Sequence, residues 1–147
     1  MAEKDPLEQA VMDIQERILE EERRIYSPIV IEESRNPYNM RKMEDAHGWG
    51  RVTGSCGDTM WIYLKVKGRT VTEATFVTDG CGATMAVGSR LMKKAEGMEI
   101  ANVLMMTDDE LVDELGGLPE DSLHCATLAV STLHKAIDDL YAKGVVG

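Results

Sequence analysis

Three cysteines, one aspartate and one histidine are the side chains of this 147-residue chain whose types suit shared chemistry: Cys56, Asp58, Cys81, His124 and Cys125. Each cysteine lies at a break in the sequence pattern, where side chains reach solvent or a ligand. Thiolates together with an imidazole suit zinc or an iron–sulfur cluster, because both bind soft ligands. An odd number of cysteines would leave one thiol over in any closed set of disulfides.

The spacing of the cysteines leaves three interpretations open. Cys81 follows Cys56 by 25 residues and Cys125 follows Cys81 by 44, so there is no Cys-x-x-Cys pair and a standard zinc finger is disfavoured. A shared metal or cluster site and unconnected buried cysteines both fit these residues. So does a cysteine nucleophile with His124 as its base and Asp58 as the group that orients the base.

The surroundings of the cysteines favour ligand binding. Glycines beside Cys56 and Cys81 leave room for a bulky group near the backbone. Cys81 is predicted at a strand-to-helix turn and Cys125 near the start of the last helix. The positive end of a helix dipole favours the thiolate that binds a metal, and this applies to Cys81 and also to Cys125.

Composition and charge exclude several classes of function. The net charge is −10 and the isoelectric point is near 4.7, which disfavours binding to nucleic acid or to anionic membranes. No apolar run approaches the roughly 20 residues of a membrane span. The polar start over 1–6 does not resemble a signal peptide. A cytoplasmic location is therefore expected, and there disulfides are disfavoured.

Residues 6–25 are predicted to form an amphipathic helix. Apolar residues recur there at spacings of 4, 3, 4 and 7, opposite acids and arginines. This apolar stripe consists of Leu7, Val11, Ile14, Ile18 and Ile25. We expect the stripe to dock on the helix's own domain, and pairing in a homodimer or with a partner helix is the alternative.

The middle of the chain is predicted to be a small antiparallel sheet. After an irregular linker that begins at Pro28, period-two patterns predict strands over 48–54, 58–67 and 69–78, with a hairpin turn at Gly68. The rest of the chain is helical: 83–95, then a capping box at 107–110 that ends at Gly116-Gly117, then a last helix opened by Leu118-Pro119. The predicted fold class is α+β, with a three-stranded antiparallel sheet covered on one side by helices.

Four motifs around the cysteines resemble one known family. The chain is similar to the iron–sulfur cluster assembly scaffolds of the IscU type, which also form the N-terminal domain of NifU proteins, from about Tyr26 to the end of the last helix. The motifs, in the order and spacing of that family, are Asn36-Pro37-Tyr38-Asn39, Cys56-Gly57-Asp58, Asp79-Gly80-Cys81-Gly82-Ala83 and Leu123-His124-Cys125. The resemblance implies an N-terminal helical extension over 1–25 and an iron–sulfur scaffold domain over 26–147.

The resemblance also implies a role for each residue of the site. The family's three cluster-binding cysteines correspond to Cys56, Cys81 and Cys125, its cluster-destabilising aspartate to Asp58 and its auxiliary histidine ligand to His124. A [2Fe–2S] cluster takes four protein ligands, so three thiolates leave one position for a replaceable ligand. Cys125 is the expected persulfide acceptor.

The implied function is a scaffold and not an enzyme. A [2Fe–2S] cluster would be assembled from iron and from sulfur delivered by a cysteine desulfurase, and then passed to apo-proteins. The alternative is a zinc-binding sulfur relay on the same cysteines, and zinc is also an alternative occupant of the cluster-free scaffold. The long insertion that marks the relay branch is absent between Cys81 and Cys125, which favours the scaffold.

One motif departs from the bacterial pattern. The family's chaperone-recognition sequence, Leu-Pro-Pro-Val-Lys, reads Leu118-Pro119-Glu120-Asp121-Ser122 here, so we do not expect handover through a dedicated heat-shock chaperone. The acidic run over 107–121 is predicted to be a solvated face. His47 and His134 are predicted to be packing or surface residues.

Overall fold

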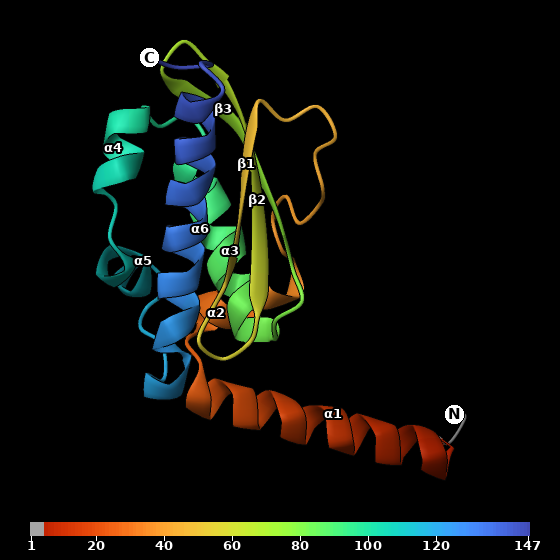
Figure 1. The fold of residues 1–147 in the computed structure, drawn as a ribbon. Helices are drawn as coiled ribbons and strands as arrows, with labels where there is room; N and C mark the ends of the chain where they lie inside the picture. Colours follow the sequence, from red (N-terminus) through yellow and green to blue (C-terminus); the bar gives the residue numbers. More distant parts are fainter. Residues whose placement is uncertain (1–4) are drawn as a thin grey trace.

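The computed structural model describes residues 5–147 and shows the predicted α+β fold (Figure 1). The sheet has the order β1-β2-β3, both pairs antiparallel, and a left-handed Gly68 closes the β2–β3 hairpin as predicted. The elements are α1 (Pro6–Ile25), α2 (Pro28–Arg35), β1 (Gly48–Thr53), β2 (Thr59–Lys67), β3 (Thr70–Thr78), α3 (Gly82–Ala95), α4 (Ile100–Met105), α5 (Asp108–Glu114), the 3₁₀ turn η1 (Glu120–Ser122) and α6 (Leu123–Ala142).

The core lies between one face of the sheet and the helices α3 and α6 (Figure 1). Phe76 of β3 is fully buried, and its ring lies so close to Gly88 of α3 that a Cβ atom there would be 2.5 Å from the ring. Apolar residues facing inward from the strands and helices exclude water from this layer. The layer holds α3 and α6 at fixed positions over the sheet.

The edge strand β1 packs directly on α6 because two of its residues have no side chain. A Cβ atom on Gly50 would lie 2.6 Å from the backbone nitrogen of Ala136, and one on Gly48 would lie 2.7 Å from a methyl carbon of Leu140. Both distances are shorter than real Cβ contacts. These glycines thus set the distance between the sheet and α6.

Asp139 of α6 caps the open edge of β1. Its Oδ2 accepts hydrogen bonds from the Trp49 backbone N–H at 2.9 Å and pairs with Lys143 Nζ at 2.7 Å. Burial alone would raise the pKa of Asp139, but the hydrogen bonds from Lys143 and Trp49 outweigh burial and hold that pKa below its usual value. The carboxylate form is therefore the one that stabilises the fold.

Replacing Asp139 should weaken the fold only where the carboxyl group is ionised. A group whose pKa is lowered on folding stabilises above its unfolded pKa, near 4, and loses that contribution as the pH falls through the folded pKa. We expect Asp139→Asn to lower the free energy of unfolding by about 1 kcal/mol at pH 7 and by less near pH 3. Urea denaturation at both pH values measures this. Asp138→Asn is the control, because Asp138 is exposed and has no partner among residues 5–147; equal stability of Asp139→Asn and the parent chain at pH 7 would contradict the prediction.

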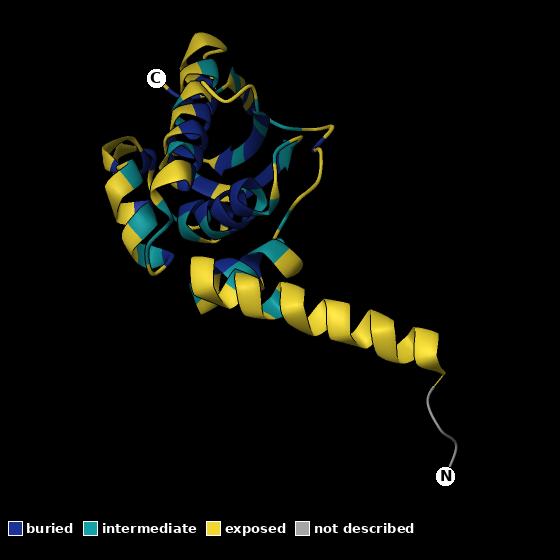
Figure 2. Cartoon of the chain, turned by 90° about the horizontal axis from the view of Figure 1, so that it is seen from below, coloured by how far each residue is buried: buried dark blue, intermediate teal, exposed yellow. Residues whose placement is uncertain are grey.

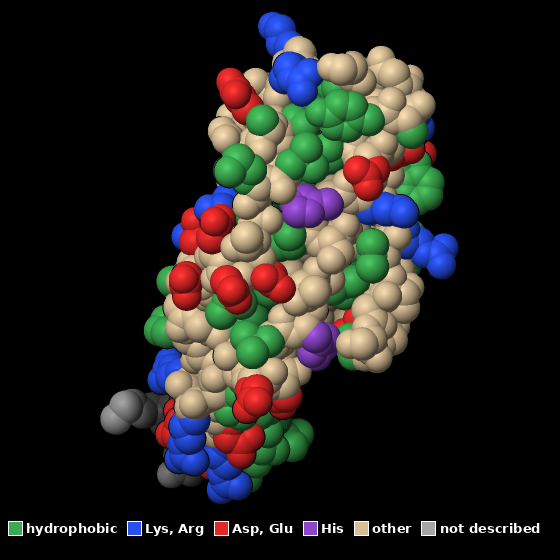
Figure 3. Space-filling view, turned by 60° about the vertical axis from the view of Figure 1, so that its left-hand side comes forward, with side chains coloured by type: hydrophobic (Ala, Val, Ile, Leu, Met, Phe, Trp, Pro, Cys, Tyr) green, Lys and Arg blue, Asp and Glu red, His purple; other side chains and the backbone are tan. Residues whose placement is uncertain are grey.

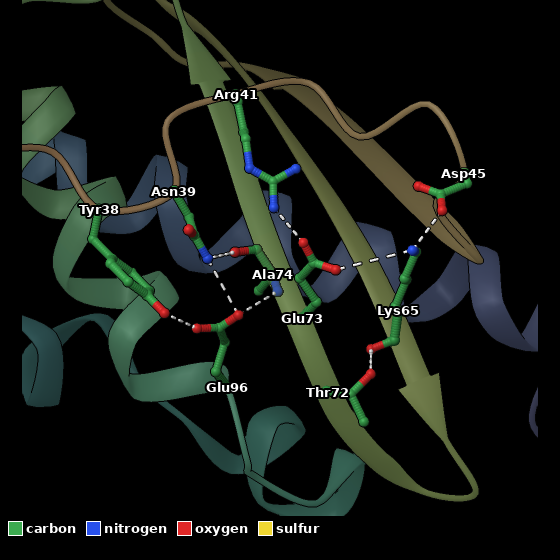
Figure 4. A network of polar contacts seen from close by, with 9 residues as sticks. All are labelled: Tyr38, Asn39, Arg41, Asp45, Lys65, Thr72, Glu73, Ala74 and Glu96. Carbon is green, nitrogen blue, oxygen red and sulfur yellow. Dashed lines mark hydrogen bonds and ion pairs between the residues drawn. The ribbon is translucent and has the colours of Figure 1, made fainter.

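The linker between α2 and β1 is fastened across β3 by polar contacts (Figure 4). Asn39, which has a positive φ of 55°, donates from Nδ2 to the Ala74 carbonyl at 3.0 Å and to Glu96 at 3.2 Å. Glu96 also accepts hydrogen bonds from the Tyr38 hydroxyl and from the Ala74 backbone N–H, and its carboxylate raises the pKa of Tyr38. The first of the four motifs thus holds the linker against the sheet.

The linker was predicted to be irregular from Pro28 onward, which is wrong over 28–35, where α2 forms. Pro28 occupies the first helical turn, where its missing N–H costs nothing, and the Ser27 hydroxyl caps the helix by accepting from the Val30 N–H at 3.1 Å. Glu33 fastens α2 to α3 through Lys93 Nζ at 2.5 Å and Ser89 Oγ at 3.1 Å. The last helix also begins later than predicted, at Leu123, because η1 intervenes after Pro119.

The N-terminal helix α1 has the predicted bounds but does not dock on its own domain, so that expectation is wrong. Figure 2 shows α1 projecting away from the rest of the molecule, and it has no buried residue. Only its last turns approach the domain, where Glu22 accepts a hydrogen bond from Arg35 at 2.7 Å. Within residues 5–147, no helix combines the length and apolar character needed to cross a bilayer.

Candidate functional site

The candidate site is built from three chain segments at one end of the sheet. The β1–β2 turn, the start of α3 and the start of α6 come together near the base of α1 (Figure 1). The turn is tight: the Gly54 N–H donates to the Asp58 carbonyl at 2.8 Å, and Gly57, with φ of +90°, donates its N–H to the Gly54 carbonyl at 3.0 Å. Gly57 takes a conformation that side chains disfavour, and the neighbouring Cys56 is exposed in this turn.

Three of the five residues selected from the sequence form one cluster of donor atoms. One ligand atom each from Cys56, Asp58 and His124 lies within 4.8 Å of the other two. Cys56 is exposed, whereas Asp58 and His124 are half-buried. A thiol, a carboxylate and an imidazole at these distances are a donor set suited to a transition-metal ion.

The other two cysteines join this cluster through Thr84. The Cys125 sulfur lies 3.3 Å from the Thr84 hydroxyl oxygen and 3.7 Å from His124 Nε2, and the Cys81 sulfur lies 3.9 Å from the same hydroxyl oxygen. Thr84 also donates to Asp58 Oδ2 at 3.4 Å. The structure therefore brings all five predicted residues to one place.

Thr84 is the residue of the site that sequence reasoning missed. It lies one helical turn after Cys81, in the first turn of α3, where its side chain faces the cysteines. A threonine at that position is ordinary in sequence terms, so only the spacing of three from Cys81 was available as a signal. Its hydroxyl links two thiols and a carboxylate and orients them without being a good metal ligand itself.

The three thiols have different environments. Cys56 and Cys81 are exposed, whereas Cys125 is buried at 2% exposure. Burial raises the pKa of Cys125, and the neighbouring groups Cys81, Cys56 and Asp58 raise it further, while the hydrogen bond with Thr84 opposes the rise. Burial therefore disfavours the thiolate of Cys125, contrary to the expectation from its place near a helix start. Cys125 must release a proton when it binds a metal.

Cys81 lies at the N-cap of α3, as the sequence predicted, and faces a small cleft. The cleft is about 200 Å³, and its wall includes Glu22 of α1, Val30 of α2 and Tyr26, which lies between these helices. A Cβ atom on Gly80 would lie 2.7 Å from the Thr84 hydroxyl and 2.9 Å from Asp58 Oδ2. The space that Gly80 leaves is thus used by the site's own side chains, which approach the backbone there.

The remaining histidines and the acidic run lie outside this cluster. His47 Nδ1 accepts from the Val66 N–H at 3.0 Å and His134 Nε2 lies 3.1 Å from the Val103 carbonyl oxygen, so both are structural, as predicted. In the acidic run, Asp108 accepts from Thr127 and Glu114 pairs with Lys94. Figure 3 shows acidic side chains gathered on the face of the molecule that is turned to the viewer. The exposed acids of the run over 107–121 are Asp109, Glu110, Asp113, Glu120 and Asp121.

The fold and the thiol-rich site together define a small α+β domain with a metal-binding type of side-chain cluster. Comparison of sequences narrows the class: the family model described as the NifU-like N terminal domain matches residues 25–146. The chain belongs to this family.

Relatives and solved structures agree with the family. The chain is 41% identical over 120 residues to "Iron-sulfur cluster assembly scaffold protein IscU 1" of Archaeoglobus fulgidus. The alignment covers 81% of this chain and 78% of the relative. It is 37% identical over 121 residues to an IscU scaffold protein of Aquifex aeolicus, covering 80% and 77%. The crystal structure of a NifU-like N-terminal protein from Brucella abortus shares the fold, with a TM-score of 0.64, 21% identity and coverage of 81% and 96%.

Proposed function

We propose that this chain is a scaffold on which an iron–sulfur cluster is assembled and from which the cluster is passed to apo-proteins. The observation that carries the proposal is the convergence of Cys56, Cys81 and Cys125 with Asp58 and His124 at one end of the domain. Relatives that share at least 37% of the aligned residues bear the name of such scaffolds. Residues 26–147 would carry this function, with 1–25 as an extension.

The cargo is a [2Fe–2S] cluster held by the three thiolates. Such a cluster takes four protein ligands, so one iron keeps a position for a weaker or borrowed ligand. Asp58 and His124 both have donor atoms close enough to Cys56 to take that position. A replaceable fourth ligand suits a protein that must release its cluster, whereas a permanent site would use a fourth thiolate.

The thiols also accept sulfur from a cysteine desulfurase. In this step the Cys125 thiolate attacks the terminal sulfur of the desulfurase persulfide, a new S–S bond forms, and the desulfurase cysteine leaves as a thiolate. Cys125 is the expected acceptor, but its 2% exposure requires the first turn of α6 to open for this attack. Cys56 and Cys81 are exposed and accessible without such a movement.

Three further properties belong to this proposal. The chain has no substrate turnover of its own, works in the cytoplasm, and uses no dedicated heat-shock chaperone. A zinc-binding sulfur relay is the second candidate function, because Cys56, Asp58 and His124, with Cys125 beside them, also suit a four-coordinate zinc ion. Zinc held in the cluster-free scaffold would use the same residues.

Anaerobic reconstitution tests the proposal. We expect the full chain, given iron and sulfide, to develop broad visible absorption with iron and labile sulfide in near-equal amounts. Cys81→Ser should lose most of this absorption, because an oxygen ligand replaces a thiolate. His134→Ala is a control that should reconstitute like the parent chain, since His134 lies outside the site.

Two other results would contradict the scaffold. Colourless protein that retains zinc and cannot be reconstituted would favour the sulfur relay. Turnover of a substrate without any metal would favour a cysteine-nucleophile enzyme with His124 as its base.

A further inference from the structure

The apolar stripe of α1 has no partner within residues 5–147. The exposed fractions are 70% for Leu7, 44% for Val11, 55% for Ile14, 51% for Ile18 and 58% for Ile25. A contiguous exposed apolar surface of this kind marks an interface. Most of the stability of a helix in a protein comes from packing of its apolar face, so burial of the stripe would stabilise α1.

The spacing of the stripe specifies what kind of surface it fits. Val11, Ile18 and Ile25 take the a positions of a heptad, Leu7 and Ile14 take the first two d positions, and Glu21 takes the third. Beta-branched residues at a combined with leucine at d, as at Leu7, favour two-stranded parallel pairing. The stripe is therefore shaped for a second helix with the same period rather than for a flat surface.

The charged side chains of α1 disfavour an anionic membrane as its partner. They are complementary when two copies of the helix pair in parallel. Over 6–25 the helix carries six acids against three arginines, which disfavours anionic lipid. Glu8 and Glu22 flank one side of the stripe at e positions, and Arg17 and Arg24 flank the other side at g positions. In a parallel pair, Arg17 faces Glu22 of the partner subunit, whereas an antiparallel pair brings like charges together.

Glu22 is positioned for such a contact. Its Oε2 is held by Arg35 at 2.7 Å, so the side chain is already ordered, and 37% of the side chain remains exposed. A pre-ordered side chain loses less conformational entropy on association. This favours pairing of α1 with a copy of itself, since the complementary charge is on the same helix.

We propose that α1 is a dimerisation element that pairs in parallel with α1 of a second copy of this chain. Each chain continues from Ile25 into α2, so parallel pairing places both domains at the same end of the helix pair. The Cys81 cleft, whose wall includes Glu22 and Tyr26, then lies beside the base of the pair in both copies. The proposal concerns assembly and does not depend on the scaffold function.

Sedimentation equilibrium of the full apo chain, over a concentration series under reducing conditions, tests this proposal. We expect a concentration-dependent dimer, and we expect the Ile14→Glu/Ile18→Glu variant to remain a monomer throughout. The matched control is Met105→Glu, because Met105 is 76% exposed on α4, away from the stripe, and its replacement should leave the dimer intact. The core does not include α1, so all variants should keep the fold, which circular dichroism checks.

Charge reversal tests the orientation. Arg17→Glu and Glu22→Arg should each weaken the dimer, and the double variant should restore it. A parent chain that stays monomeric, or that dimerises equally well with the stripe mutated, overturns the proposal. Tighter association of Arg17→Glu would overturn the parallel arrangement.

Discussion

Replacing Asp58 by alanine is expected to lengthen the lifetime of the bound cluster. The Asp58 carboxylate is a hard oxygen donor beside Cys56 and His124, where a softer donor would bind iron more firmly. Without it, the open iron position falls to the His124 imidazole or to an added thiol. We expect the rate of cluster loss under air or chelator to fall on the order of tenfold, the lower end of the effects that changes around a metal site produce.

Loss of visible absorption over time, after anaerobic reconstitution, measures this effect. Asp138→Ala is the matched control, because it removes the same charge from an exposed position on α6 that has no partner among the described residues. It should leave the rate of cluster loss unchanged. A rate that is the same in Asp58→Ala and in the parent chain would remove Asp58 from its proposed role as the labile ligand.

The site could be predicted from the sequence because its residues lie in short motifs at structural breaks. Cys56 lies in a tight turn and Cys81 at a helix N-cap, and both positions are marked by neighbouring glycines. The strands were predictable from their period of two, and the turn between β2 and β3 from Gly68. Local patterns of this kind indicate which residues lie in a turn or at the end of a helix, where their side chains can reach a ligand.

The burial of a residue depends on contacts that no local pattern contains. Cys125 lies in the first turn of its helix as expected, yet burial in the core raises its pKa, and the hydrogen bond with Thr84 opposes that rise. The stripe of α1 shows the converse: its period predicts a buried face but not which surface buries it. The partners of Cys125 lie far from it in the sequence, and within residues 5–147 the stripe of α1 is left exposed.

Replacing Gly50 by alanine is expected to be among the most destabilising single methyl additions to this chain. The new Cβ would lie 2.6 Å from the Ala136 nitrogen and 2.9 Å from the Lys135 carbonyl carbon, both atoms of the α6 backbone. Helix backbone cannot rotate away, so β1 and α6 must separate along their length. We expect the free energy of unfolding to fall by about 3 kcal/mol, at the upper end for an overpacked core.

Glycines with other neighbours supply the controls for this prediction. Gly48→Ala should cost less, because the nearest atoms belong to the flexible Leu140 side chain at 2.7 Å and 2.8 Å. Gly54→Ala, with its nearest contact at 3.6 Å, should change the free energy of unfolding by less than about 0.5 kcal/mol. Urea denaturation of the three variants should therefore rank Gly50, Gly48 and Gly54 in decreasing order of loss.

That ranking tests how the domain positions its site. Cys125 is 11 residues before Ala136 on the same helix, about 16 Å along its axis, so the contact at Gly50 holds the far end of the element that presents this thiol. Equal losses for Gly50→Ala and Gly54→Ala would show that α6 can shift off β1 freely. In that case the position of Cys125 would rest on Thr84 and the neighbouring core alone, and not on the contact between β1 and α6.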